Sequence, residues 1–242
     1  MYSQSENRNL KDLDTISQGV PWTHPRACHL LYQLALTFTN PEVLEIACCY
    51  GKASIYLAAG AKRQGGSFTC TDIDEYLWGG KSAIDLLREA GVLEVSRVKF
   101  GHDARWFVLD LLSGRPGQWI DFVYLDLTHT IEVDSFVALA TWTHLRPGGI
   151  IVLDDLDWIP AVDGVMHGLQ DMKVVSRPNV KHVRAIFDYL ARLPDVNDVT
   201  EWGEEEVEWT WGFLRKQGRV GSAEVSLTDL VRRLDRPSMS NG

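Results

Sequence analysis

Residues 44–54, LEIACCYGKAS, form the stretch that decides the expected fold of this chain. A short apolar run ends in Glu45, and a turn of small residues follows and closes on Gly51. This order is typical of a parallel strand that leads into a ligand-binding turn and a helix. Turns that hold a pyrophosphate usually carry three glycines, but here Ala47 and Cys49 accompany the single Gly51. Taken alone, the turn fits an altered phosphate loop, a site for a ligand without phosphate, or core packing.

Strand-like and helix-like segments alternate on both sides of this turn. We predict strands at 43–47, 67–71, 97–100, 120–125 and 150–153, and helices at 25–38, 52–63, 75–90, 104–112, 132–144 and 180–192. Short apolar strands that alternate with helices favour a mostly parallel, doubly wound α/β sheet covered on both faces. The segment LRPGG, residues 145–149, predicts a tight turn, and two aromatic segments at 198–205 and 206–216 predict a C-terminal antiparallel hairpin.

Bulk properties limit the class of protein. The chain has 242 residues and 45% hydrophobic residues, which suits one sizeable α/β core. We expect an N-terminal arm or lid at 1–24, the main domain at 25–218 and a tail at 219–242. No secretory signal or membrane-spanning run is evident. The net charge of −9 disfavours a nucleic-acid-binding face, and four cysteines without metal spacing indicate reduced thiols in a cytoplasmic protein.

Polar groups follow all five predicted strands. Because the carboxyl ends of parallel strands meet at one sheet edge, we expect these groups to lie together. Each one alone is more often a helix N-cap or a turn residue, but their joint occurrence indicates a binding site. The groups are Glu45, Asp72, Asp74, His102, Asp103, Asp126, His129, Asp154, Asp155 and Asp157.

The first strand ends suit a nucleoside without phosphate. Asp72 lies 21 residues after Gly51 (72 − 51), near the offset at which an acid accepts hydrogen bonds from both ribose hydroxyls. Asp103 is placed to accept from an adenine amine. Glu45 would repel a phosphate and instead favours a cationic ligand or its ammonium group.

The segments LEIACCYGKAS, CTDID, GHDA, DFVYLDLTH and LRPGGIIVLDDLDW resemble, in order and spacing, a class I S-adenosylmethionine-dependent methyltransferase. The resemblance covers residues 43–158 and implies a Rossmann-like seven-stranded sheet. Glu45 to Gly51 would border the methionine part of the cofactor, Asp72 the ribose, and Asp103 with Ala104 the adenine. The cofactor-binding residues that it implies are Glu45, Ala47, Cys49, Gly51, Ser54, Asp72, Ile73, Asp103, Ala104 and Asp126. The family usually has glycine where this chain has Ala47 and Cys49.

The second half is similar to the branch of small-molecule O-methyltransferases that use a divalent metal. That resemblance implies Mg²⁺ ligands at Asp126, Asp154 and Asp155, which are oxygen donors suited to this cation. It also implies catalytic roles for Asp126 and for His129, the latter as a general base. An alternative places the Asp154 side chain toward the sheet and gives its ligand position to Asp157.

The expected acceptor is a small-molecule hydroxyl, on a secondary metabolite or a sugar. Relatives often form homo-oligomers, and no nucleic-acid or membrane partner is expected. Alternative hypotheses are a metal-independent N- or O-methyltransferase, a non-catalytic binding protein of the same fold, and, least favoured because of its turn, an NAD-type enzyme. Aromatic and imidazole side chains that could line the acceptor pocket are Tyr2, Trp22, His24, Trp158, Trp202, Trp209 and Trp211. The alternative for the three hairpin tryptophans is core packing, which we expect for at least one of them.

Overall fold

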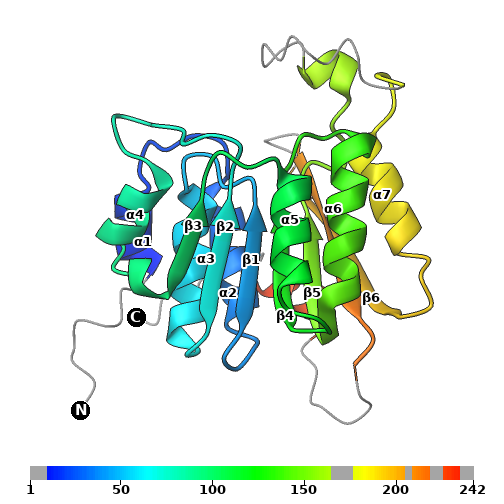
Figure 1. Ribbon diagram of the computed structural model, residues 1–242, viewed down its shortest axis with the longest axis horizontal. Helices are drawn as coiled ribbons and strands as arrows, with labels where there is room; N and C mark the ends of the chain where they lie inside the picture. The colour runs from blue at the N-terminus through cyan, green and yellow to red at the C-terminus, as the bar shows by residue number, and fades with distance from the viewer. Residues whose placement is uncertain (1–9, 165–176, 205–208, 219–225, 235–242) are drawn as a thin grey trace.

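A computed structural model describes residues 10–164, 177–204, 209–218 and 226–234, which include a seven-stranded sheet (Figure 1). The strand order is β3-β2-β1-β4-β5-β7-β6. All pairs from β3 to β5 are parallel, and β7 pairs antiparallel with both β5 and β6. The doubly wound, mostly parallel sheet with a C-terminal antiparallel hairpin is therefore confirmed. The strands are β1 (Glu42–Ile46), β2 (Ser67–Thr71), β3 (Ser96–Lys99), β4 (Ile120–Leu125), β5 (Leu145–Leu153), β6 (Val196–Glu204) and β7 (Trp209–Lys216).

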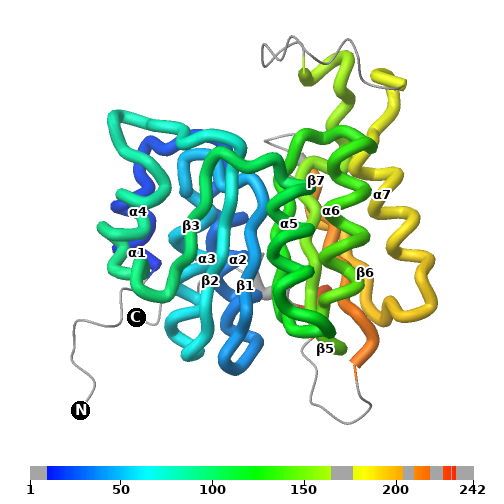
Figure 2. The backbone as a smooth tube through the Cα atoms, in the orientation of Figure 1, coloured from blue at the N-terminus to red at the C-terminus, as the bar shows by residue number. Residues whose placement is uncertain are grey.

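Helices cover both faces of the sheet, and each face has its own hydrophobic core. One core joins α1, α2, α3, α4 and α8 to one side of the strands, and the other joins α5, α6 and α7 to the opposite side. Figure 2 shows α5 to α7 side by side over one half of the sheet. The helices are α1 (Leu10–Ile16), α2 (Pro25–Ala35), α3 (Lys52–Arg63), α4 (Ala83–Glu89), α5 (Ala104–Ser113), α6 (Ile131–His144), α7 (His182–Leu190) and α8 (Leu227–Leu234), with short turns η1 (Leu93–Val95) and η2 (Pro160–Gly164).

The central strand β4 explains why this sequence forms a covered parallel sheet. All six of its residues are buried, so its side chains pack against helices on both faces. Strand β1 lies beside it and pairs with β2 on its other edge. Successive crossovers run in opposite directions from β1 and β4, which makes the edge beyond their carboxyl ends the expected binding position.

The start of one predicted helix and one predicted turn are wrong. Helix α4 begins at Ala83, not near residue 75, because Gly79 and Gly80 adopt φ values of 58° and 80° and Ser82 with Asp85 forms a capping box. The expected turn at 145–149 belongs to β5. The register of β4 against β5 shifts between Ile120 and Phe122, which accommodates these residues as a bulge within the strand.

The N-terminal region contributes to the core. Leu13 of α1 is fully buried, and Ser17 Oγ lies 3.1 Å from the Tyr56 hydroxyl of α3. Tyr2 and most of the predicted tail fall outside the described residues. Within the described ranges, no helix combines the length and the apolar character that crossing a membrane requires.

Candidate active site

The turn after β1 has the backbone conformation of a glycine-rich turn although two of its positions are not glycine. Ala47, Cys49 and Gly51 have φ values of 70°, 45° and 83°. The left-handed region costs a non-glycine residue about 1–2 kcal/mol. Backbone hydrogen bonds from Ala47 N to Thr71 O, at 2.9 Å, and from Gly51 N to Cys48 O, at 2.7 Å, hold the turn. Ala47 and Cys49 therefore hold backbone conformations that glycine adopts readily.

Gly51 is required by space as well as by conformation. A Cβ atom at this position would lie 2.6 Å from the Cα and Cβ atoms of Ala83. The start of α3 consequently packs directly against the start of α4.

Two acids stand behind this turn. Glu45 is buried, and its Oε2 accepts a hydrogen bond of 2.5 Å from Ser54 Oγ. The pKa of Glu45 is raised to about 8, chiefly by burial and also by repulsion from Asp72, although the Ser54 hydrogen bond lowers it. Asp72 accepts from the Cys49 and Ile73 backbone N–H groups at 2.7 Å each. A cationic ligand beside Glu45 would favour its charged form.

The third strand end differs from the first two. Asp103 is the N-cap of α5, and its carboxylate pairs with the guanidinium of Arg105 at 2.7 Å. Hydrogen bonding to Arg105 lowers the pKa of Asp103 despite some burial. Ile73 is exposed beside Asp72. Asp103 and Ile73 do not line the cavity described in the next paragraph. The same holds for Gly51, Ser54, Asp72 and Ala104.

A cavity of about 690 Å³ opens at the carboxyl edge of β1, β4 and β5. Of the residues predicted from the sequence, Glu45, Ala47, Cys49, Asp126, His129, Asp154, Asp155 and Asp157 line it. Trp22, His24, Trp158 and Trp211 line it as well, whereas Trp202 packs in the core against Trp211 with ring centroids 5.9 Å apart. The Trp209 side chain lies outside the described part of the structure.

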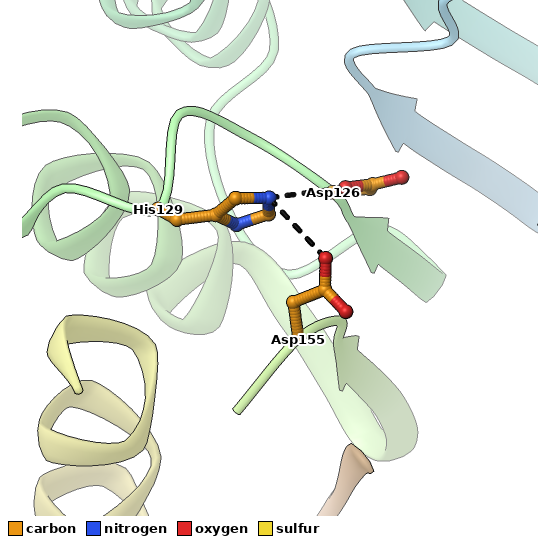
Figure 3. A group of neighbouring side chains, drawn as sticks. All are labelled: Asp126, His129 and Asp155. Carbon is orange, nitrogen blue, oxygen red and sulfur yellow. Dashed lines mark ion pairs between the residues drawn. The ribbon is translucent and has the colours of Figure 1, made fainter. Parts of the chain in front are cut away.

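Asp126, His129 and Asp155 converge in this cavity (Figure 3). His129 Nε2 lies 3.8 Å from Asp126 Oδ1 and 3.4 Å from Asp155 Oδ2. One ligand atom from each of the three lies within 4.8 Å of the others, which is close enough to hold a metal ion. His129 and Asp155 adopt left-handed φ values of 56° and 53°, and the His129 ring lies against Trp158 at 4.6 Å. The loops after β4 and β5 thus aim these side chains at one point.

Burial makes the two carboxyl groups of this cluster costly to charge. It raises the pKa of Asp126 well above its ordinary value, and repulsion from Asp155 and Glu45 adds to the effect. Burial, together with repulsion from Asp154 and Asp163, raises the pKa of Asp155 to about 8. A cation between Asp126 and Asp155 would offset both effects.

The remaining predicted metal ligand points elsewhere. Asp154 Oδ2 accepts a 2.5 Å hydrogen bond from the Tyr124 hydroxyl, and Asp154 Oδ1 accepts from the Asp155 N–H at 2.7 Å. Asp157, the alternative ligand, forms ion pairs of 3.0 Å with Lys181 and Arg184. The structure therefore brings Asp126 and Asp155 together with His129, and holds Asp154 and Asp157 outside that group.

Sequence reasoning missed several residues that line the cavity. Tyr124 is the clearest, because it sits in an apolar strand where its hydroxyl had no evident partner. Its position two residues before Asp126 on β4 places it over the same sheet edge as the acids. The others are Pro21, Thr23, Cys48, Tyr50, Lys52, Ala53, Tyr76, Leu127, Asp163 and Thr210.

Comparison with known proteins agrees with this geometry. Residues 44–156 match the family model described as "Methyltransferase domain". The chain has no significant match among curated protein sequences.

Solved structures that share the fold include two O-methyltransferases. The O-methyltransferase TomG from Streptomyces achromogenes, involved in tomaymycin synthesis and solved with S-adenosylmethionine, is 19% identical with a TM-score of 0.62, and the match covers 90% of this chain and 92% of that one. An O-methyltransferase from Bacillus cereus in complex with S-adenosylhomocysteine is 17% identical with a TM-score of 0.62, covering 89% and 93%. The match over the β1-to-β5 region indicates a methyltransferase domain in this chain, and its fold is the one that these solved O-methyltransferases have.

Proposed function

We propose that this methyltransferase acts on a hydroxyl group of a small molecule, with assistance from Mg²⁺. The observation that carries the proposal is the convergence of Asp126, His129 and Asp155 in one cavity with the turn after β1. The structural neighbours described as O-methyltransferases support a hydroxyl as acceptor. A secondary-metabolite or sugar hydroxyl suits a cavity with both aromatic and acidic walls.

The cofactor would lie along the ends of β1, β2 and β3. Glu45 and the turn from Ala47 to Gly51 would face the cationic methionine end, with Ser54 supporting Glu45. Asp72 would accept from the ribose hydroxyls, and Ile73, Asp103 and Ala104 would border the adenine. For Asp103 this requires the carboxylate to share its hydrogen bonds between Arg105 and the base.

The acceptor end fits a divalent cation by its donor set. Asp126 and Asp155 supply carboxylate oxygens, which Mg²⁺ prefers, and water fills the other positions of such sites. Asp154 would join them only after turning away from Tyr124. When bound, the ion would lower the pKa of the acceptor hydroxyl.

The chain's own residues would then orient the acceptor and remove its proton. When bound, S-adenosylmethionine would supply the methyl group to the acceptor oxygen, with S-adenosylhomocysteine as the leaving group. The hydroxyl proton passes to Nε2 of His129, whose ring is held between Trp158 and the two carboxylates.

A metal-independent transfer is the second candidate. The observation that favours it is the 3.4 Å approach of His129 Nε2 to Asp155 Oδ2, an arrangement in which the carboxylate would stabilise the imidazolium that forms when Nε2 takes the acceptor proton. In that case the acidic pair would serve His129 directly, and no cation would be needed.

Two measurements test the proposal in sequence. Titration calorimetry with S-adenosylhomocysteine should give saturable binding, and the absence of binding would contradict it. Methyl transfer to a panel of small hydroxyl compounds should then fall at least about 10-fold with EDTA and recover with Mg²⁺. Transfer that is unchanged by EDTA would favour the metal-independent candidate.

We also propose a cytoplasmic location and a homo-oligomeric assembly without nucleic-acid partners. All four cysteines are free, as expected in a reducing compartment, and the net charge of −9 opposes phosphate binding. Fractionation of cells, light scattering of the purified protein and a nucleic-acid binding assay at low salt test these three points.

A further inference from the structure

The loop that carries His129 is held from both sides by buried side chains. It runs from the end of β4 to the start of α6, residues 126–130. Before His129, the Thr128 hydroxyl donates to Asp134 Oδ1 at 2.9 Å and lies 2.7 Å from Thr130 Oγ1. After it, the Ile131 N–H donates to His182 Nδ1 at 3.1 Å. The bonds to Asp134 Oδ1 and to His182 Nδ1 are made by Thr128 and Ile131, which flank His129 in the chain.

Asp134 is the anchor on α6. Its side chain is buried, with 4% of the residue exposed. The pKa of Asp134 is about 7, because burial raises it more than the hydrogen bonds lower it. Those hydrogen bonds come from the Thr128 side chain and from the backbone of Thr130, Thr128 and His129. The polar groups around this carboxyl therefore come from the loop itself.

His182 is the anchor on α7. It is also buried, and its Nε2 lies 2.9 Å from the carbonyl oxygen of Arg177. A carbonyl only accepts, so Nε2 carries the proton and Nδ1 is free to accept from Ile131. Both ring nitrogens are used in one fixed tautomer, which ties the start of α6 to α7.

We propose that Asp134 and His182 are positioning residues for His129, which hold its ring toward Asp126 and Asp155. A non-glycine residue at a φ of 56° keeps that conformation only where its surroundings impose it. A general base must also stay within hydrogen-bond reach of the proton it removes. The inference rests on the proposed role of His129 in methyl transfer.

Substitutions at both anchors test the proposal against simple helix capping. Asp134→Ala should lower kcat about 10- to 100-fold with the KM for S-adenosylmethionine unchanged, since small displacements of a catalytic group have effects of this size. Asp134→Asn and His182→Asn keep an acceptor oxygen near the original position and should recover most of the rate, whereas His182→Leu should not. Thr128→Val removes the hydroxyl that donates to Asp134 and should lower kcat by the same factor as Asp134→Ala. It provides the test of the positioning role if Asp134→Ala does not fold.

Asp85→Ala is the matched control. Asp85 also lies in the first turn of a helix and accepts from Ser82 N, at 3.1 Å, but it is far from His129 in the chain and outside the cavity. It should lose stability and keep kcat. If Asp134→Ala and Thr128→Val match Asp85→Ala in kcat, the positioning role is wrong.

A spectroscopic readout separates this inference from the proposed function. In protein labelled with ¹³C-histidine, the His129 ring signal is identified by its loss in His129→Gln. It should shift or broaden in Asp134→Ala and stay in place in Asp85→Ala. An unshifted signal would overturn the inference. Absence of methyl transfer in the wild-type protein would contradict the proposed function, and the ring signal would still decide the role of Asp134.

Discussion

The Tyr124 hydroxyl donates a hydrogen bond of 2.5 Å to Asp154 Oδ2 at the floor of the cavity. Asp155, the next residue, instead turns its carboxylate toward His129, with Oδ2 at 3.4 Å from Nε2. Its φ of 53° is what separates the directions of the two side chains. Two adjacent aspartates therefore occupy different chemical surroundings, one bound to the sheet and one facing the cluster.

This difference predicts unequal effects of removing each charge. Asp155→Asn should lower methyl transfer at limiting Mg²⁺ at least about 10-fold, because it removes a carboxylate of the cluster. Asp154→Asn should lower it less, since its oxygen remains bonded to Tyr124. The measurement is the initial rate as a function of Mg²⁺ concentration for both variants. Equal losses would show that Asp154 turns into the cluster in the working enzyme.

Gly51 offers a second test, with a built-in control. Gly51→Ala combines a φ of 83° with a Cβ placed 2.6 Å from Ala83, so we expect it to lower the free energy of unfolding by about 2–5 kcal/mol. Gly148→Ala has the same φ of 83° and open space around the added Cβ. It should cost only the strain, about 1–2 kcal/mol. Urea unfolding of both variants measures the difference, and equal costs would refute the close packing of α3 against α4.

The parallel part of the fold was predictable because its strands are mostly short and apolar and are followed by helices. Strand β4 shows this best, since IDFVYL is apolar apart from Asp121 and is buried throughout. The helix predicted at 75–90 failed for a local reason. Gly79 and Gly80 interrupt it, and Leu77 and Trp78 stay partly exposed, with the Trp78 ring centroid 5.7 Å from that of Tyr50. Apolar spacing alone did not reveal that these side chains face solvent.

Several residues that line the cavity were predictable from the sequence, but the orientations of their side chains were not. Strand ends placed the acids at one edge, because parallel strands share a direction. The direction of each side chain depends on backbone angles in the loops. The left-handed values at His129 and Asp155 do not follow from residue type alone, although Asp and His adopt them more often than most residues. No sequence pattern predicted the hydrogen bond from the Tyr124 hydroxyl to Asp154. The roles of these residues stay predictions.

Ala47 and Cys49 lead to the third prediction. Both hold glycine-like conformations, so Ala47→Gly and Cys49→Gly should relieve strain of about 1–2 kcal/mol and lose about 0.5–1 kcal/mol to the flexibility of glycine. The net change in the free energy of unfolding should lie near zero or be slightly favourable. The dissociation constant for S-adenosylhomocysteine should stay within about threefold, as measured by calorimetry. A large gain in affinity would mean that the native side chains obstruct the cofactor.

The fourth prediction concerns pH and Glu45. Its pKa is about 8 in the folded protein and near the ordinary 4.5 when exposed. Between about pH 4.5 and 8 the folded protein keeps a proton that the unfolded chain has lost, so this group makes the free energy of unfolding fall as the pH rises. Glu45→Gln keeps an acceptor for Ser54 Oγ and removes that contribution. Urea unfolding at several pH values from 5 to 8 should therefore give a flatter pH dependence for the variant than for the wild type.

Ligand binding completes this test, because the other buried acids also shape the wild-type pH dependence. Asp72 and Asp126 both remain in Glu45→Gln, so the difference between the two proteins reports the removal of Glu45, including the loss of its repulsion of these two acids. A cationic cofactor favours the ionised form of Glu45, and its binding to the wild type should strengthen as the pH rises from 6 to 9. In Glu45→Gln that strengthening should be smaller and binding at pH 9 weaker. If calorimetry with S-adenosylmethionine gives the same pH dependence for both proteins, Glu45 does not face the cationic end of the cofactor.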